Sequence, residues 1–215
     1  LHRLIRRQRQ MCIRDRYLMA RAAKQAGTPA IRTSSIRDVI AIKEETGLPV
    51  IGLVKIQYPG YEGYITPTMK EVDDLVAAGS DVVALDCTLR KRGDGITVNE
   101  FIAQIKEKYP DIILMADISN YEEGINAWKC GVDIVGTTMS GYTDYTSKKD
   151  EPDYELMERL AKDTDIPIIG EGKIHYPNQA VKALQTGVWA IVVGGAITRP
   201  LEIAQRFQKA IEAGK

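Results

Sequence analysis

Lys55 and Glu171 are two side chains whose types and positions suit proton transfer. Lys55 directly follows the apolar run 50–54, and Glu171 directly follows residues 168–170. A lysine at the end of a buried strand can lose its proton through poor hydration and neighbouring cations, and can then act as a base. Facing each other, the two groups could remove and supply protons at an acidic carbon. The alternative is a surface lysine with a buried stem and a solvated acid at a helix start.

Asp86 and Asp117 follow two further apolar runs. Either carboxylate could orient Lys55 or bind a sugar hydroxyl. The rival interpretation is a Mg²⁺ site, because two carboxylates can hold that ion, although the sequence offers no clear third ligand. His2 and His175 are the only histidines, which argues against a site built from several histidines.

The segment GGAITRP at 194–200 predicts a phosphate site. Gly194 and Gly195 would let backbone N–H groups approach an anion, and a helix beginning near Pro200 would add its positive end. Arg199 could add a forked contact, and Gly172 follows the preceding strand. The alternative is an ordinary strand-to-helix turn that uses glycine for its shape.

The elements that position these residues alternate along the chain. Apolar runs rich in Val and Ile indicate buried parallel strands at 50–54, 82–85, 112–115, 132–135, 166–169 and 188–193, with a weaker strand at 30–32. Capping-box pairs predict helix starts at Thr68/Glu71, Thr97/Glu100 and Ser119/Glu122. Left-handed glycines are expected after helices at 47, 79, 131, 187 and 214. Trp128 and Trp189 are expected in the core.

This order favours a closed parallel barrel. LPVIGLVK at 48–55 resembles IPIIGEGK at 166–173, as a repeated strand–helix unit would. Seven strands spread evenly over about 200 residues predict a (β/α)₈ TIM-type barrel of the phosphate-binding kind, with its chemistry at the strand ends. A doubly wound sheet is the weaker alternative, because no dinucleotide or P-loop glycine motif is present.

Composition excludes several classes of protein. The 215 residues carry 29 basic and 29 acidic side chains, and this balance argues against a nucleic-acid partner. No apolar run approaches the roughly 20 residues that span a membrane, and no secretory signal is present. The three widely spaced cysteines, Cys12, Cys87 and Cys130, support neither a disulfide framework nor a zinc motif. We therefore expect a cytoplasmic protein.

Residues 1–16 differ from the rest of the chain. They hold six arginines and only one acid, Asp15, whereas residues 17–215 have the composition of one barrel domain. The segment QMCIRDR at 10–16 resembles translated adapter sequence, so residues 1–16 are treated as an atypical segment, a candidate artefact.

Seven motifs in order resemble the N-acetylmannosamine-6-phosphate 2-epimerase family from about Tyr17 onward. They are IRTS (31–34), GLVK (52–55), ALDCTLR (84–90), MADIS (115–119), GTTMSGY (136–142), GEGKIH (170–175) and GGAITRP (194–200). The resemblance implies an isomerase that interconverts N-acetylmannosamine 6-phosphate and N-acetylglucosamine 6-phosphate in bacterial sialic acid use. It implies no metal or organic cofactor.

By motif position, the resemblance makes Lys55 and Glu171 the catalytic pair. It implies substrate contacts at Arg32 and Asp117, to which we add Asp86 and Thr138. The expected phosphate contacts are Gly172, Gly194, Gly195 and Arg199.

The chain departs from the family at its start, where the family has a first barrel strand. Residues 1–16 show no such strand, so we expect a barrel that lacks it. Two alternatives therefore stay open: an inactive phosphosugar-binding barrel fragment, and an epimerase of another sugar phosphate. A homodimer is compatible with the sequence.

Overall fold

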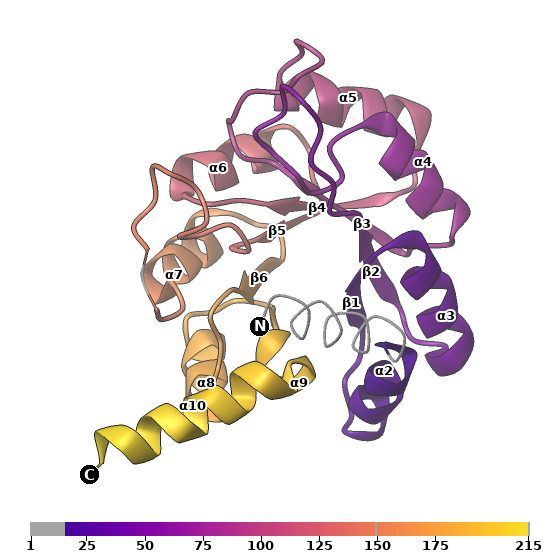
Figure 1. Cartoon of the computed structure of the whole chain (residues 1–215). Helices are drawn as coiled ribbons and strands as arrows, with labels where there is room; N and C mark the ends of the chain where they lie inside the picture. Colours follow the sequence, from indigo (N-terminus) through magenta and orange to yellow (C-terminus); the bar gives the residue numbers. More distant parts are fainter. Residues whose placement is uncertain (1–15, 149, 215) are drawn as a thin grey trace.

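The computed structural model describes residues 16–148 and 150–214 as strands alternating with helices (Figure 1). The strands are β1 (Ile31–Ser34), β2 (Val50–Leu53), β3 (Val82–Asp86), β4 (Ile113–Asp117), β5 (Ile134–Gly136), β6 (Ile168–Glu171) and β7 (Ala190–Val192). The helices are α2 (Arg16–Gln25), α3 (Ile36–Thr46), α4 (Met69–Ala77), α5 (Val98–Lys108), α6 (Tyr121–Lys129), α7 (Tyr154–Asp163), α8 (Pro177–Gln185), α9 (Gly195–Thr198) and α10 (Pro200–Ala213).

The sheet confirms the predicted barrel. All neighbouring strands run parallel, in the order β1 to β7, and the sheet curls round with the helices outside it (Figure 1). Among the described residues, β1 and β7 each pair on one side only. This arrangement fits the expected absence of one strand. The prediction that residues 1–16 hold no barrel strand concerns residues 1–15, which lie outside the described part of the chain. Arg16 begins α2 and donates to the Ser34 carbonyl at 2.8 Å.

Apolar side chains pack on both faces of the sheet. Between the sheet and the helices lie Phe101, Leu75 and Leu160, all buried. Inside the barrel lie Ile51, Leu53, Val82, Ala84, Met115, Met139 and Ile169, together with Ile65 from the segment after β2. This double burial explains why the strands read as continuous apolar runs.

Two of the three capping boxes are confirmed. At Thr97, the side chain accepts from the Glu100 N–H at 3.2 Å, and Glu100 accepts from the Thr97 N–H at 2.7 Å. The Ser119/Glu122 prediction is wrong because Asn120 caps α6 instead, accepting from the Glu123 N–H at 2.9 Å.

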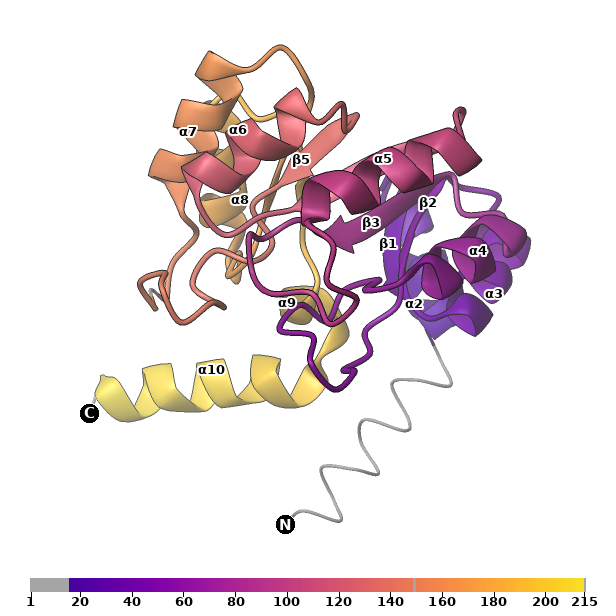
Figure 2. The same cartoon turned by 90° about the horizontal axis from the view of Figure 1, so that it is seen from above.

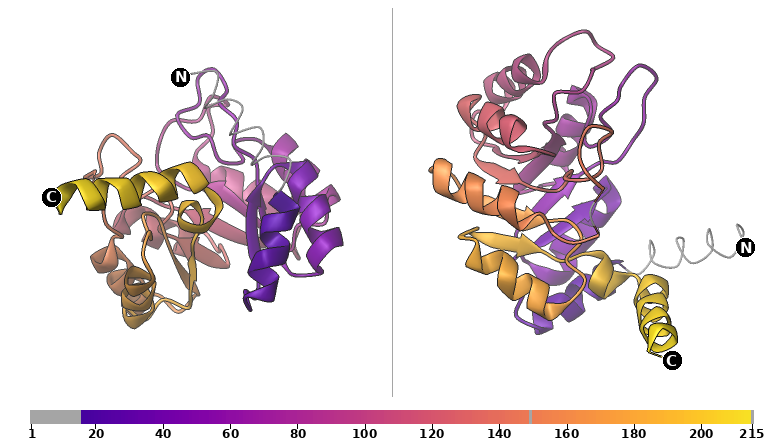
Figure 3. Two further views of the ribbon diagram at one scale, coloured as in Figure 1. Left: turned by 60° about the horizontal axis from the view of Figure 1, so that its bottom comes forward. Right: turned by 90° about the vertical axis from the view of Figure 1, so that its left-hand side faces the viewer.

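Two predictions near the C-terminal end also fail. Gly214 has φ −91°, since its N–H still bonds to the Ala210 carbonyl as in a continuing helix. Trp189 is 71% exposed because it precedes an edge strand. No residue of α10 is buried, and the helix lies outside the ring of helices (Figures 2 and 3). Trp128 is half-buried and donates to Asp165. No described helix is long and apolar enough to span a membrane.

Candidate active site

The side chain of Arg32, the second residue of β1, meets Asp117 and Glu171, the last residues of β4 and β6. The Arg32 side chain is 6% exposed and that of Asp117 is fully buried. Arg32 Nη1 and Nη2 donate to Asp117 Oδ1 and Oδ2 at 2.9 and 2.6 Å, a two-pronged ion pair. Nη1 also lies 3.2 Å from Glu171 Oε2. Burial opposes the charge on Arg32, but the two carboxylates outweigh burial and raise its pKa.

Thr138, two residues beyond β5, lies between the two carboxylates. Its Oγ1 is 2.6 Å from Asp117 Oδ1 and 3.2 Å from Glu171 Oε2. Burial raises the pKa of Glu171, the Asp117 charge adds to this, and the Arg32 guanidinium opposes it. Glu171 is therefore a carboxyl group that can hold a proton at higher pH than an ordinary glutamate.

Gly136 leaves room for this cluster. A Cβ added there would lie 2.3 Å from the Met115 methyl group and 3.5 Å from Asp117 Oδ1. Arg32 Nη1 also lies 3.2 Å from the Met115 sulfur. The glycine at the end of β5 thus lets Met115 support the ion pair from inside the barrel.

Lys55 lies two residues beyond the end of β2, exposed at the barrel mouth. Reduced hydration within the mouth lowers its pKa, and the positive charges of Arg32 and Arg199 lower it further. Glu171 and Asp117 act in the opposite direction. Lys55 is therefore electrostatically coupled to the cluster at the other strand ends.

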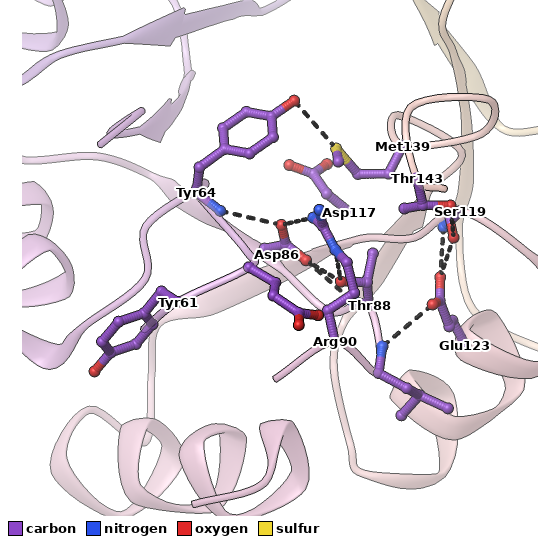
Figure 4. Close-up of polar contacts among 12 residues, drawn as sticks. Tyr61, Tyr64, Asp86, Thr88, Arg90, Asp117, Ser119, Glu123, Met139 and Thr143 are labelled. Carbon is purple, nitrogen blue, oxygen red and sulfur yellow. Dashed lines mark hydrogen bonds and ion pairs between the residues drawn. The ribbon is translucent and has the colours of Figure 1, made fainter. Parts of the chain in front are cut away.

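Asp86 ends β3 and is 8% exposed. Its Oδ1 accepts from the Thr88 N–H at 3.1 Å, and its Oδ2 accepts from Arg90 at 2.7 Å (Figure 4). The Tyr64 N–H also lies 3.4 Å from Oδ2. Burial raises the pKa of Asp86, against the influence of Thr88 and Arg90. Its substrate contact stays a prediction, because the described contacts of this carboxylate are to loop groups.

The expected phosphate segment follows β6 and β7. Gly172 has φ +106°, a conformation that favours glycine. Gly194 precedes the short helix α9, which the sequence did not predict, and a Cβ added at Gly194 would meet no described atom within 4 Å. Arg199 lies 3.0 Å from Glu202 and close enough to Lys55 to lower its pKa. Arg199 therefore lies near the same mouth as Lys55, and the phosphate contacts of this segment stay a prediction.

Sequence reasoning missed Thr66. This residue is fully buried and has φ +46°, and its neighbour Ile65 bridges to Lys55. A signal was present in the Thr66–Pro67 pair, because a residue before proline is conformationally restricted.

The sequence model of the family described as "Putative N-acetylmannosamine-6-phosphate epimerase" matches residues 17–213. The chain belongs to this family. A relative named as such a 2-epimerase, from Caldanaerobacter subterraneus subsp. tengcongensis, is 56% identical over 189 residues, which are 88% of this chain and 80% of the relative. Another, from Clostridioides difficile, is 50% identical over 194 residues, 90% of this chain and 86% of the relative.

One solved structure agrees with the epimerase-family assignment, and a second shows the fold alone. The N-acetylmannosamine-6-phosphate 2-epimerase from Clostridium perfringens superposes with a TM-score of 0.86 at 48% identity, covering 90% of this chain and 84% of that one. A thiamine phosphate pyrophosphorylase from Pyrococcus furiosus has a TM-score of 0.59 at 20% identity, a likeness of fold alone. Within the epimerase-family barrel of this chain, Arg32, Asp117, Thr138 and Glu171 are in direct contact.

Proposed function

We propose that this chain is an isomerase that interconverts N-acetylmannosamine 6-phosphate and N-acetylglucosamine 6-phosphate. The observation that carries the proposal is the contact of Glu171 with the Arg32–Asp117 ion pair, together with Lys55 at the barrel mouth, near enough for the charges of all three to act on it. The pKa of Lys55 is lowered and that of Glu171 is raised. Two groups whose pKa values approach each other can exchange protons with a carbon acid in both directions.

The chemistry follows from the substrate. Opening the sugar ring exposes a carbonyl at C1, which acidifies the proton on C2. Removal of that proton breaks the C2–H bond and leaves its electron pair in an enolate, and protonation on the opposite face inverts C2. Lys55 exchanges the C2 proton, and Glu171 serves ring opening or the second proton transfer. The Arg32 guanidinium would stabilise the negative oxygen of the enolate.

The remaining site residues bind the sugar phosphate. Arg32, Asp86, Asp117 and Thr138 contact the sugar. The phosphate is held by the loops after β6 and β7, through Gly172, Gly194, Gly195 and Arg199. The substrate is a soluble metabolite, and the protein acts in the cytoplasm without a metal or organic cofactor.

Proton NMR of N-acetylmannosamine 6-phosphate in D₂O with the protein, with and without EDTA, tests this proposal. Deuterium should enter at C2 while the N-acetylglucosamine epimer appears, to the same extent with EDTA. Loss of exchange with EDTA that Mg²⁺ restores would instead favour the Asp86–Asp117 metal site. Binding without exchange would favour an inactive phosphosugar-binding barrel. Exchange only on another sugar phosphate would mean that the protein is an epimerase of that sugar phosphate, with the same proton-transfer chemistry.

A further inference from the structure

Thr66 has a backbone conformation that its side chain disfavours. Its φ of +46° is left-handed, although threonine is branched at Cβ and precedes Pro67. Both properties disfavour this region. Such strain persists only where the surroundings hold it, and it concentrates at functional sites. Thr66 is also fully buried, so its surroundings must hold the backbone in this conformation.

The Thr66 side chain spans a gap between two strands. The pairing of β2 with β3 extends only as far as Gly52 and Val83. Beyond it, the Val54 N–H donates to Thr66 Oγ1 at 3.2 Å, and Oγ1 donates to the Ala84 carbonyl at 2.6 Å. The hydroxyl thus joins the two strands where their direct pairing has ended.

The backbone of Thr66 completes the attachment. Its N–H donates to the Val54 carbonyl at 2.7 Å, so both backbone groups of Val54 are held by one residue. Val54 directly precedes Lys55, and Ile65 forms an antiparallel bridge with Lys55 itself. The backbone that carries Lys55 is therefore fixed through residues 65 and 66.

Asp86 supports the same segment from β3. Its N–H donates to the Ile65 carbonyl at 2.9 Å, and its carboxylate lies 3.4 Å from the Tyr64 N–H. Figure 4 shows this carboxylate between Tyr64 and Arg90. Arg90 and Thr88 hold the carboxylate in turn. Residues 64–66 are thus fastened to both strands next to Lys55.

We propose that Thr66 is a positioning residue that sets Lys55 through the Val54 backbone, with its hydroxyl bridging β2 and β3. The role assigned to Lys55 rests on the proposed function, whereas its placement by Thr66 does not. Proton transfer depends steeply on geometry, and a misplacement of about 1 Å can lower a rate about 100-fold.

The charged groups facing Lys55 come from β1, β4, β6 and the segment after β7. They are Arg32, Asp117, Glu171 and Arg199. A shift of the Lys55 backbone changes its distance to all of them and its hydration. Its titration therefore reports its position independently of turnover.

Four variants test the proposal. Thr66→Val removes the hydroxyl and keeps the shape, and Thr66→Ser restores the hydroxyl. Thr66→Gly also lacks the hydroxyl but tolerates the left-handed φ, so it should fold where Thr66→Val does not. Thr46→Val is the matched control: Thr46 is 2% exposed, donates to the Ile42 carbonyl at 2.7 Å and accepts from the Leu48 N–H at 3.2 Å.

The measurements are kcat and KM with N-acetylmannosamine 6-phosphate, and NMR titration of Lys55 in lysine-labelled protein. In Thr66→Val and Thr66→Gly we expect kcat to fall about 10–100-fold with little change in KM, and the pKa of Lys55 to differ from that of the parent. Thr66→Ser and Thr46→Val should match the parent in both readouts.

Two results overturn the positioning role. One is that the variants without the hydroxyl keep the parent's Lys55 titration, and the other is that Thr46→Val shifts it equally. If the parent protein exchanges no deuterium at C2, the proposed function fails. The Lys55 titrations then still decide whether Thr66 positions this residue.

Discussion

Reduced hydration and neighbouring charges bring the pKa values of Lys55 and Glu171 closer together. The pKa of Glu171 lies above its ordinary 4.5, and that of Lys55 lies below its ordinary 10.5. In the proposed mechanism, the pair transfers protons when it holds one proton between its two groups. A second proton binds as the pH falls through the Glu171 pKa, and the last proton leaves as the pH rises through the Lys55 pKa.

The pH dependence of kcat/KM should therefore be bell-shaped, with its acid limb above pH 4.5 and its alkaline limb below pH 10.5. Initial rates measured across this pH range, by a coupled assay or by NMR, give this pH dependence. The residual activity of Glu171→Gln should lose the acid limb. A rate that stays flat down to pH 4.5 would remove Glu171 from proton transfer.

Lys55→Met should keep the fold and remove nearly all turnover. Acid–base catalysis by one side chain contributes about 10²–10⁴-fold, so a loss of this size in kcat is expected. Lys70→Met is the control, because Lys70 is an exposed lysine on α4 that pairs with Asp74. Turnover by Lys55→Met within about threefold of the parent would refute the assignment.

Arg199→Ala should weaken binding of the phosphorylated sugar by about 1.5–3 kcal/mol, the scale of a hydrogen bond to a charged group. Calorimetry with the phosphorylated and the unphosphorylated sugar separates the contribution of the phosphate to the binding free energy from that of the sugar. Lys209→Ala removes a positive charge from the exposed surface of α10 and should change neither affinity. Equal weakening for both sugars would show that Arg199 does not bind phosphate.

Among the helices, α5 offers a clean test of local stability. Its first turn is closed by the reciprocal bonds of Thr97 and Glu100. Thr97→Ala should lower the free energy of unfolding by about 1 kcal/mol, because one helix N–H loses its acceptor. Thr97→Ser should retain the cap. Urea unfolding measures both, and an unchanged midpoint in Thr97→Ala would show that the cap contributes nothing.

The strands were predictable because burial on both faces leaves a strong apolar signal, as in β3, where all residues are buried. Helix starts were less certain where two capping residues compete. Ser119 and Asn120 are adjacent, and Asn120 takes the cap while Ser119 donates to Glu123. The exposure of Trp189 depends on how β7 is covered, which its own sequence does not specify.

Part of the site was also predictable, because strand ends in a parallel barrel converge on one face. Arg32, Asp117 and Glu171 were expected there, and they lie in contact. The contacts of Asp86 with Tyr64 and Arg90 were not predicted, since they depend on the paths of two loops. The bridging contacts of Thr66 were missed because they depend on a gap between β2 and β3; the Thr66–Pro67 pair indicates a restricted backbone but not these partners.

At the scale of the molecule, the site is distributed round the barrel. Lys55 follows β2, Arg32 lies in β1, Asp117 in β4 and Glu171 in β6. Their contacts join residues that are far apart in the chain, such as Arg32 and Asp117. Formation of the site therefore requires most of the barrel to be folded.

In the described sheet, β1 and β7 are the two edges, because each pairs on one side only. Two residues proposed to bind the substrate lie beside these edges, Arg32 in β1 and Arg199 shortly after β7. Amide hydrogens at such edges open to solvent more readily than those of the central β3 and β4. A sugar phosphate held by both arginines would fasten one edge to the other. Hydrogen–deuterium exchange should then slow in β1 and β7 when N-acetylmannosamine 6-phosphate is added, and change little in β3 and β4. Slowing confined to one edge would mean that the ligand does not span the opening.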